Sequence, residues 1–158
     1  FNGDISHWDT SNITKLNSMF YAASSFNQDI SGWDVSGVND WYGMNSMFYG
    51  AESFNQDISQ WDVSNVNNMY GMFYNAKSFN QDIGDWDVSS VTDMRNMFDD
   101  ADSFDQDISD WDISNVTRMG NMFNSANDLS DDNKCAIHTS FDSNSNWPYD
   151  WEEYCSEE

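Results

Sequence analysis

The chain is organised around the stretch SFNQDIGDWDVSSVTDMRNMFDDA, residues 78–101, because close copies of it fill most of the sequence. The copies begin at five phenylalanines, which follow one another after 25, 28, 25 and 25 residues: Phe1, Phe26, Phe54, Phe79 and Phe104. A fixed period of this length is typical of tandem units, each too short to bury its own apolar face. We therefore expect the units to stack as coils, with residues 1–128 forming the repeat region and residues 129–158 a C-terminal cap.

The two halves of each copy have different periods. In the second half, apolar residues recur at offsets of 0, 3, 6, 7 and 10: Val91, Met94, Met97, Phe98 and Ala101. This spacing predicts one apolar stripe on a short helix, with Ser89 placed to cap its first turn. The first half, residues 79–88, combines strand formers with turn residues, which favours a short strand that pairs in parallel with its copy in the next coil.

The charge of the chain excludes some classes of partner. There are 28 acidic residues against five basic ones, a net charge of -23. Such a surface repels phosphate backbones and anionic lipid, so we expect no nucleic-acid binding. No run of 18 apolar residues occurs, which predicts no membrane insertion. The chain opens on the first residue of a copy, which favours a mature or excised C-terminal piece of a longer protein.

Both cysteines, Cys135 and Cys155, lie in the tail that follows the repeats. A bridge between them would close a loop of about 20 residues and add on the order of 3 kcal/mol of stability. The alternative is a pair of unconnected thiols. Since nothing else in the tail indicates metal or redox chemistry, we predict the disulfide. In the same tail, Ser130 followed by two aspartates predicts the start of a capped helix.

Two aspartates recur in every copy and form two ladders along the expected stack. Their carboxylates can accept backbone N–H groups in Asx turns, or rows of oxygen ligands can hold Ca²⁺ between coils. We favour the turns. The Ca²⁺ candidates are Asp29, Asp57, Asp82 and Asp107. Bound calcium would raise the melting temperature, and no other cofactor is expected.

Aromatic residues provide the candidates for ligand contact. The tryptophan column can pack inside the stack or form an exposed strip for sugar stacking, and we favour the interior: Trp8, Trp33, Trp61, Trp86 and Trp111. The second copy carries three extra residues between Val38 and Met44. Insertions in stacked repeats usually lie on the surface, so Trp41 and Tyr42 are expected to be exposed and are candidate binding residues.

Nothing in the sequence indicates catalysis. The two histidines, His7 and His138, are isolated from each other and match neither a metal-binding nor a triad pattern. The chain also lacks a glycine-rich phosphate loop. We expect that the protein is not an enzyme.

The motif FNQDISxWDVSxVxxMxxMFxxA resembles the repeat of the BspA-like branch of leucine-rich-repeat surface proteins, over residues 1–126. The resemblance implies a leucine-rich-repeat-like α/β solenoid: a right-handed stack of about five to six coils, with short parallel strands, short helices and a C-terminal cap. It also implies an extracellular or cell-surface array associated with adhesion. Two sequons, at Asn12 and Asn115, are candidate glycosylation sites if the source glycosylates its secreted proteins.

The sequence therefore predicts a secreted or cell-surface, non-enzymatic repeat domain that mediates adhesion or binds a protein or glycan surface. The alternative is a structural subunit of an extracellular filament or surface layer, assembled by end-to-end stacking. The bare first coil motivates this alternative, since an uncovered end invites self-association.

Overall fold

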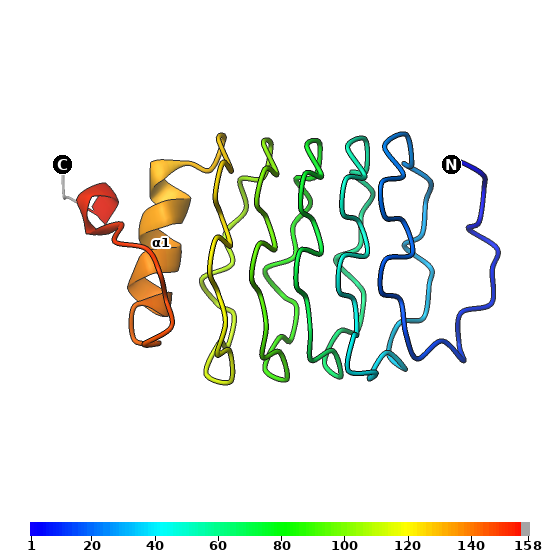
Figure 1. Cartoon of the computed structure of the whole chain (residues 1–158), viewed down its shortest axis with the longest axis horizontal. Helices are drawn as coiled ribbons and strands as arrows, with labels where there is room; N and C mark the ends of the chain where they lie inside the picture. The colour runs from blue at the N-terminus through cyan, green and yellow to red at the C-terminus, as the bar shows by residue number, and fades with distance from the viewer. Residues whose placement is uncertain (156–158) are drawn as a thin grey trace.

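The computed structural model of the chain describes residues 1–155. Each sequence copy forms one coil, and the coils lie side by side in a row with the two termini at opposite ends (Figure 1). Regular secondary structure is confined to the tail, where helix α1 spans Asp131–Phe141 and the 3₁₀ helix η1 spans Glu152–Cys155. Within the described residues, no helix is long and apolar enough to cross a membrane.

The predicted α/β solenoid of short parallel strands and short helices is wrong. Residues 1–128 contain no helix and no sheet. Their strand-like pairing is limited to two isolated parallel bridges, which join Asn68 to Asp93 and Asp93 to Arg118. The coils are instead built from successive tight turns.

Left-handed residues explain why the predicted helix does not form. In the fourth coil, Asn96 and Asp100 have positive φ angles of 55° and 57°. The equivalent positions of the other coils are also left-handed: Ser18, Ala22, Ser46, Gly50, Gly71, Asn75, Asn121 and Ser125. A right-handed helix cannot contain a left-handed residue at every fourth position. Polar residues and glycine adopt this conformation most readily, and they fill nine of the ten positions.

The same segment joins neighbouring coils through its backbone. Alternate N–H groups in residues 93–100 donate to carbonyls of the next coil, with N···O distances of 2.8 to 3.1 Å. The pairs are Met94 to Arg118, Asn96 to Gly120, Phe98 to Met122 and Asp100 to Asn124. The carbonyls of the intervening residues accept in the same way from the preceding coil. We call this segment and its equivalents the ladder segment. Its donors all face the C-terminal end of the stack, and its acceptors face the N-terminal end.

The first half of each coil joins its neighbours largely through side chains, which is why the predicted strand does not form. The indole Nε1 of Trp86 donates to the Ile58 carbonyl of the preceding coil over 3.2 Å. The Oδ1 atom of Asn55 accepts from both the Asn80 backbone N–H and the Gln81 side-chain amide, at 2.9 and 2.8 Å. Equivalent bonds recur along the stack, so these side chains replace a β ladder.

Stacked aromatic rings fill the interior. Met97 and Phe98, which were predicted to be buried, have no exposed surface. The ring of Phe98 stacks on those of Phe73 and Phe123, with centroid separations of 5.7 and 5.5 Å. Burying side chains of this kind stabilises the fold by roughly 1.5–3 kcal/mol each. The apolar periodicity therefore identified the interior, although the backbone that carries it is not helical.

The tail covers the last coil. Ser130 is the N-cap of α1, and its hydroxyl accepts from the Asn133 N–H over 3.4 Å. Ile137 and Phe141 on α1 are buried. A disulfide joins Cys135 of α1 to Cys155 of η1, with the Cα atoms 4.9 Å apart. This pairing holds the two helical elements of the tail together.

Candidate functional site

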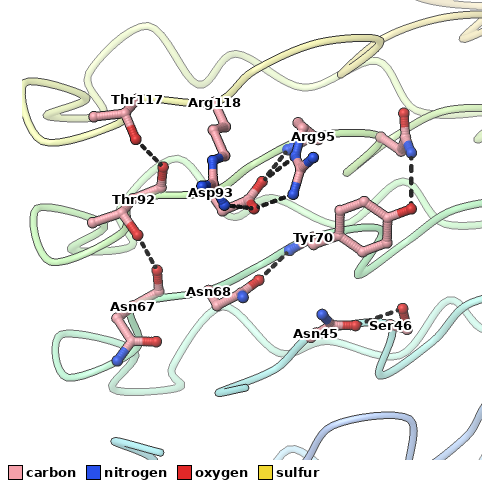
Figure 2. A network of polar contacts seen from close by, with 11 residues as sticks. Asn45, Ser46, Asn67, Asn68, Tyr70, Thr92, Asp93, Arg95, Thr117 and Arg118 are labelled. Carbon is pink, nitrogen blue, oxygen red and sulfur yellow. Dashed lines mark hydrogen bonds and ion pairs between the residues drawn. The ribbon is translucent and has the colours of Figure 1, made fainter. Parts of the chain in front are cut away.

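A groove of about 650 Å³ runs across the second to fifth coils. Its polar centre is drawn in Figure 2. We call it the arginine groove, after the two cations that line it together with aromatic, amide and hydroxyl side chains: Trp41, Tyr42, Asn45, Asn67, Asn68, Tyr70, Thr92, Asp93, Arg95, Thr117 and Arg118.

The insertion in the second coil forms the aromatic rim of the groove. Trp41 is 73% exposed and Tyr42 is 52% exposed. The turn is held by Asp40, whose Oδ1 accepts from the Tyr42 N–H over 3.0 Å. Gly43 ends the insertion with a φ of 44°, and a Cβ there would lie 3.0 Å from the Asn68 carbonyl oxygen. The extra residues thus form a surface projection whose two rings lie beside the groove.

A buried carboxylate organises the two arginines. Asp93 is only 4% exposed. Arg95 binds it in a bidentate manner, with Nε 3.0 Å from Oδ1 and Nη2 2.7 Å from Oδ2, whereas Nη1 of Arg118 lies 3.5 Å from Oδ2 (Figure 2). Burial alone would raise the pKa of Asp93, but the Arg95 hydrogen bonds and charge hold that pKa below its ordinary value.

Arg95 also connects the carboxylate to an aromatic ring. Its guanidinium lies 5.3 Å from the centroid of the Tyr70 ring, which is a cation–π contact. The Tyr70 hydroxyl accepts from the Asn96 side-chain amide over 3.3 Å. The Arg95 guanidinium is therefore fixed in position, because it contacts the Asp93 carboxylate and the Tyr70 ring at the same time.

The charge of the groove differs from that of the chain. Two arginines and one aspartate leave the lining with a surplus of one positive charge, while the whole chain carries -23. Lys15, another of the five basic residues of the chain, lies at the rim with its Nζ 5.0 Å from the Tyr42 ring centroid. The groove is a local cationic and aromatic surface on a strongly acidic protein.

Sequence reasoning found the rim but missed the charged centre. Trp41 and Tyr42 were singled out, whereas Asp93, Arg95 and Arg118 were not. A signal was present, because Asn68, Asp93 and Arg118 follow one another after one period of 25 residues. Stacking places such residues side by side, and the two parallel bridges join them directly.

The structure favours turns at the aspartate ladders. The Oδ1 atoms of the four calcium candidates each accept the backbone N–H two residues later, at 2.9 to 3.0 Å: Asp29, Asp57, Asp82 and Asp107. The pKa of Asp29 is lowered by the Ser31 hydroxyl and backbone N–H. Among residues 1–155, no group of three or more His, Cys, Asp or Glu side chains is placed to hold a metal ion.

The remaining sequence candidates lie away from the groove. Four tryptophans of the column are 3% to 4% exposed and so pack inside the stack, whereas Trp8 in the first coil is 46% exposed. Both sequon asparagines, Asn12 and Asn115, are exposed. The side-chain amide of Asn115 donates to the Ser89 carbonyl over 2.8 Å, so it already bonds to the preceding coil.

Comparison with known proteins identifies one family. A family model described as "Mycoplasma protein of unknown function, DUF285" matches the chain twice, over residues 1–44 and 41–137. No curated protein and no solved structure matches the chain. The two matches together span all five repeat copies.

Proposed function

The chain belongs to the family of Mycoplasma proteins of unknown function, DUF285, and we propose that it is a non-enzymatic, extracellular or cell-surface repeat domain that binds a protein or glycan partner. Membership of the BspA-like branch of surface proteins is part of this proposal, and it rests on the repeat motif FNQDISxWDVSxVxxMxxMFxxA. The observation that carries the proposal is the arginine groove.

The composition of the groove supports binding. Tryptophan, tyrosine and arginine are the residue types that contribute most to interaction energy at protein surfaces. Here Trp41 and Tyr42 are largely exposed, and the Arg118 side chain is 59% exposed. Two neighbouring exposed aromatic rings beside a guanidinium with available donors match the composition of recognition surfaces, which favours a binding role.

The disulfide supports an extracellular location. Structural disulfides form and persist in oxidising compartments and are rare in the reducing cytosol. Cys135 and Cys155 form such a bond between α1 and η1. The large negative charge also suits a protein that stays dispersed outside the cell.

The test is a binding screen of the whole chain against a glycan array and a panel of purified extracellular-matrix proteins. We expect at least one partner whose binding is lost in the Trp41→Ala variant. That substitution removes an exposed ring without opening the core, so the melting temperature is expected to stay unchanged. The proposal fails if no partner binds, or if every partner binds the variant as tightly as the parent.

The second candidate function is a structural subunit assembled end to end, and the open first coil favours it. In the ladder segment of that coil, four carbonyls accept no hydrogen bond from any described residue: Lys15, Asn17, Met19 and Tyr21. Four apolar side chains are exposed on the same coil: Phe1, Trp8, Met19 and Tyr21. Among residues 1–155, nothing covers these groups.

The opposite end of the stack is capped, which makes end-to-end assembly the weaker of the two candidate functions. The ladder donors that would complement the open carbonyls belong to the fifth coil, which the tail covers. Identical chains therefore cannot continue the ladder end to end while the cap stays folded. Sedimentation velocity over a range of concentrations tests this point. We expect a monomer throughout, and growth into long species would reverse the ranking.

A further inference from the structure

We propose that the arginine groove binds a glycan that carries a carboxylate group, such as a uronic or sialic acid. In this arrangement the carboxylate pairs with Arg118 and a pyranose ring lies on Trp41. The inference rests on the proposed function, since it names the ligand class of the same groove.

Arg118 is the cation available to such a ligand. A guanidinium has five N–H donors, and the side-chain contact of Arg118 is a single one, 3.5 Å long, to Asp93. Both oxygens of Asp93 already receive shorter bonds from Arg95. The Arg118 fork therefore keeps most of its donors free, and planar bidentate pairing with a carboxylate is the contact that this fork makes best.

Trp41 provides the apolar platform. Its side chain is 73% exposed and makes no ring contact with another described aromatic residue. A pyranose presents a face of C–H groups with its hydroxyls around the edge, so it can cover an indole while its hydroxyls stay hydrogen-bonded. The indole is rigid, which keeps the entropy cost of this contact low.

Side-chain amides without an acceptor line the same groove as the indole and the arginine. Asn45 uses its side-chain oxygen to accept from the Ser46 hydroxyl, and Asn68 uses its own to accept from the Tyr70 N–H. Their side-chain NH₂ groups have no acceptor among the described residues. Asn67 offers a third amide in the same lining. Such donors match the hydroxyl and ring oxygens of a sugar.

The backbone of the groove argues for a glycan over an acidic peptide. An extended peptide usually binds by adding main-chain hydrogen bonds to an exposed edge. Here the coils already use these groups, since the Thr92 and Thr117 N–H groups donate to the preceding coils and the Arg118 carbonyl accepts from Met94. The free groups of the groove belong to side chains, which suits a ligand rich in hydroxyls.

The net charge of the chain affects how fast an anionic ligand associates with it. A chain with a charge of -23 repels an anionic ligand at long range, while the ion pair in the groove acts only at contact. Added salt screens the long-range repulsion more than it weakens a partly desolvated contact. We therefore expect the association rate constant of an acidic sugar to rise with salt.

The experiment is isothermal titration calorimetry of the whole chain with two matched pairs of sugars. The first pair is sialyllactose and lactose, and the second is tetragalacturonic acid and its methyl ester. In each pair the acidic sugar is expected to bind roughly 10-fold or more tightly, which is the usual contribution of a charge-assisted hydrogen bond. The preference is expected to disappear in Arg118→Gln, while Trp41→Ala weakens both members of each pair.

A matched variant separates local pairing from net charge. Lys77 is exposed and lies outside the groove, so Lys77→Gln makes the same charge change elsewhere. It is expected to keep the preference for acidic sugars. The proposal is overturned if Lys77→Gln removes the preference as Arg118→Gln does, or if Arg118→Gln leaves it intact. Both variants are checked for an unchanged melting temperature, because neither side chain is buried.

Two further outcomes distinguish this inference from the proposed function. If hexaglutamate binds as tightly as the acidic sugars and depends equally on Arg118, the site recognises carboxylates in peptides and the glycan assignment is wrong. If no sugar binds but a protein partner depends on Trp41, the inference fails while the proposed function stands. If neither sugars nor proteins bind, both fail.

Discussion

At the N-terminal end of the stack, Phe1 is 67% exposed, whereas at the C-terminal end Phe123 is only 5% exposed. The tail covers Phe123, and its aromatic residues surround that ring. Trp151 approaches it most closely, with a centroid separation of 5.5 Å. The hydroxyl of Tyr149 accepts the Phe123 N–H over 2.8 Å, which pairs one ladder donor of the last coil.

The comparison shows that the two ends need different chemistry. The ladder segment presents acceptors at one end of the stack and donors at the other. The cap is adapted to the donor end. The first half of the last coil instead presents an acceptor to the cap, because Asp105 stands where the other four coils have asparagine. Its Oδ1 accepts from the Ser130 N–H and from the Asn133 side chain, where a negative charge favours the start of α1.

The largest expected effect compares two members of one phenylalanine column. Phe79 has no exposed surface, so Phe79→Ala is expected to lower the free energy of unfolding by about 3–5 kcal/mol. Phe1→Ala, at the open end, is expected to cost less than about 0.5 kcal/mol. Urea unfolding followed by tryptophan fluorescence measures both. Equal losses would show that the first coil is covered in solution.

The next prediction tests how the cap is held. Replacing Cys135 and Cys155 together by alanine is expected to lower stability by about 3 kcal/mol. Because the bond lies within the tail, amide exchange is expected to accelerate first in α1 and only later in the interior coils. Uniform acceleration along the chain would indicate that cap and coils unfold as one unit.

A third prediction concerns the capping hydroxyl. Tyr149→Phe leaves the buried Phe123 N–H without its acceptor, which is expected to cost about 1–3 kcal/mol. Burial raises the pKa of Tyr149 to about 12. Because the pKa of Tyr149 is raised in the folded state, its contribution to stability is complete below its ordinary pKa of about 10. That contribution is lost as the pH rises through the folded-state pKa.

The pH dependence supplies the control for that substitution. Between about pH 10 and 12, stability of the parent chain is expected to fall more steeply than that of Tyr149→Phe. Urea midpoints at a series of pH values measure the two slopes. Identical slopes would mean that the Tyr149 hydroxyl does not lie buried against the last coil.

The smallest expected effect tests the left-handed backbone conformation of the ladder segment. Gly71 has a φ of 56°, and a Cβ there would meet only ordinary contacts at 3.6 Å or more. Gly71→Ala is therefore expected to destabilise by about 1 kcal/mol through its left-handed backbone. In the helix that the sequence predicted, the same change would stabilise by a similar amount. Gly120→Ala, at an open position without positive φ, is the matched control and is expected to be nearly neutral.

Much of the architecture was accessible from the sequence. The period located every coil, the apolar positions identified the buried residues such as Met97 and Phe98, and Ser130 marked the start of α1. These inferences succeeded because they depend on burial and helix capping, which do not require a particular backbone conformation in the coils. The surface projection at Trp41 followed from the same reasoning.

The backbone of the coils was not accessible from apolar spacing alone. Intervals of three and four residues fit a run of tight turns as well as a helix. The signal that separates them is the recurrence of glycine, asparagine, aspartate or serine at every fourth position, as at Gly71 and Asn75. The charged centre of the groove was missed for a related reason, since Asp93 and Arg118 become neighbours only when the copies are aligned in register.

The most direct test of the account is the measurement of NMR scalar couplings across backbone hydrogen bonds. We expect couplings from the Met94 amide nitrogen to the Arg118 carbonyl carbon, and from the Phe98 amide nitrogen to the Met122 carbonyl carbon. Couplings between residues four apart within one copy would instead show a helix. That result would contradict the stack of alternating turns and the groove built upon it.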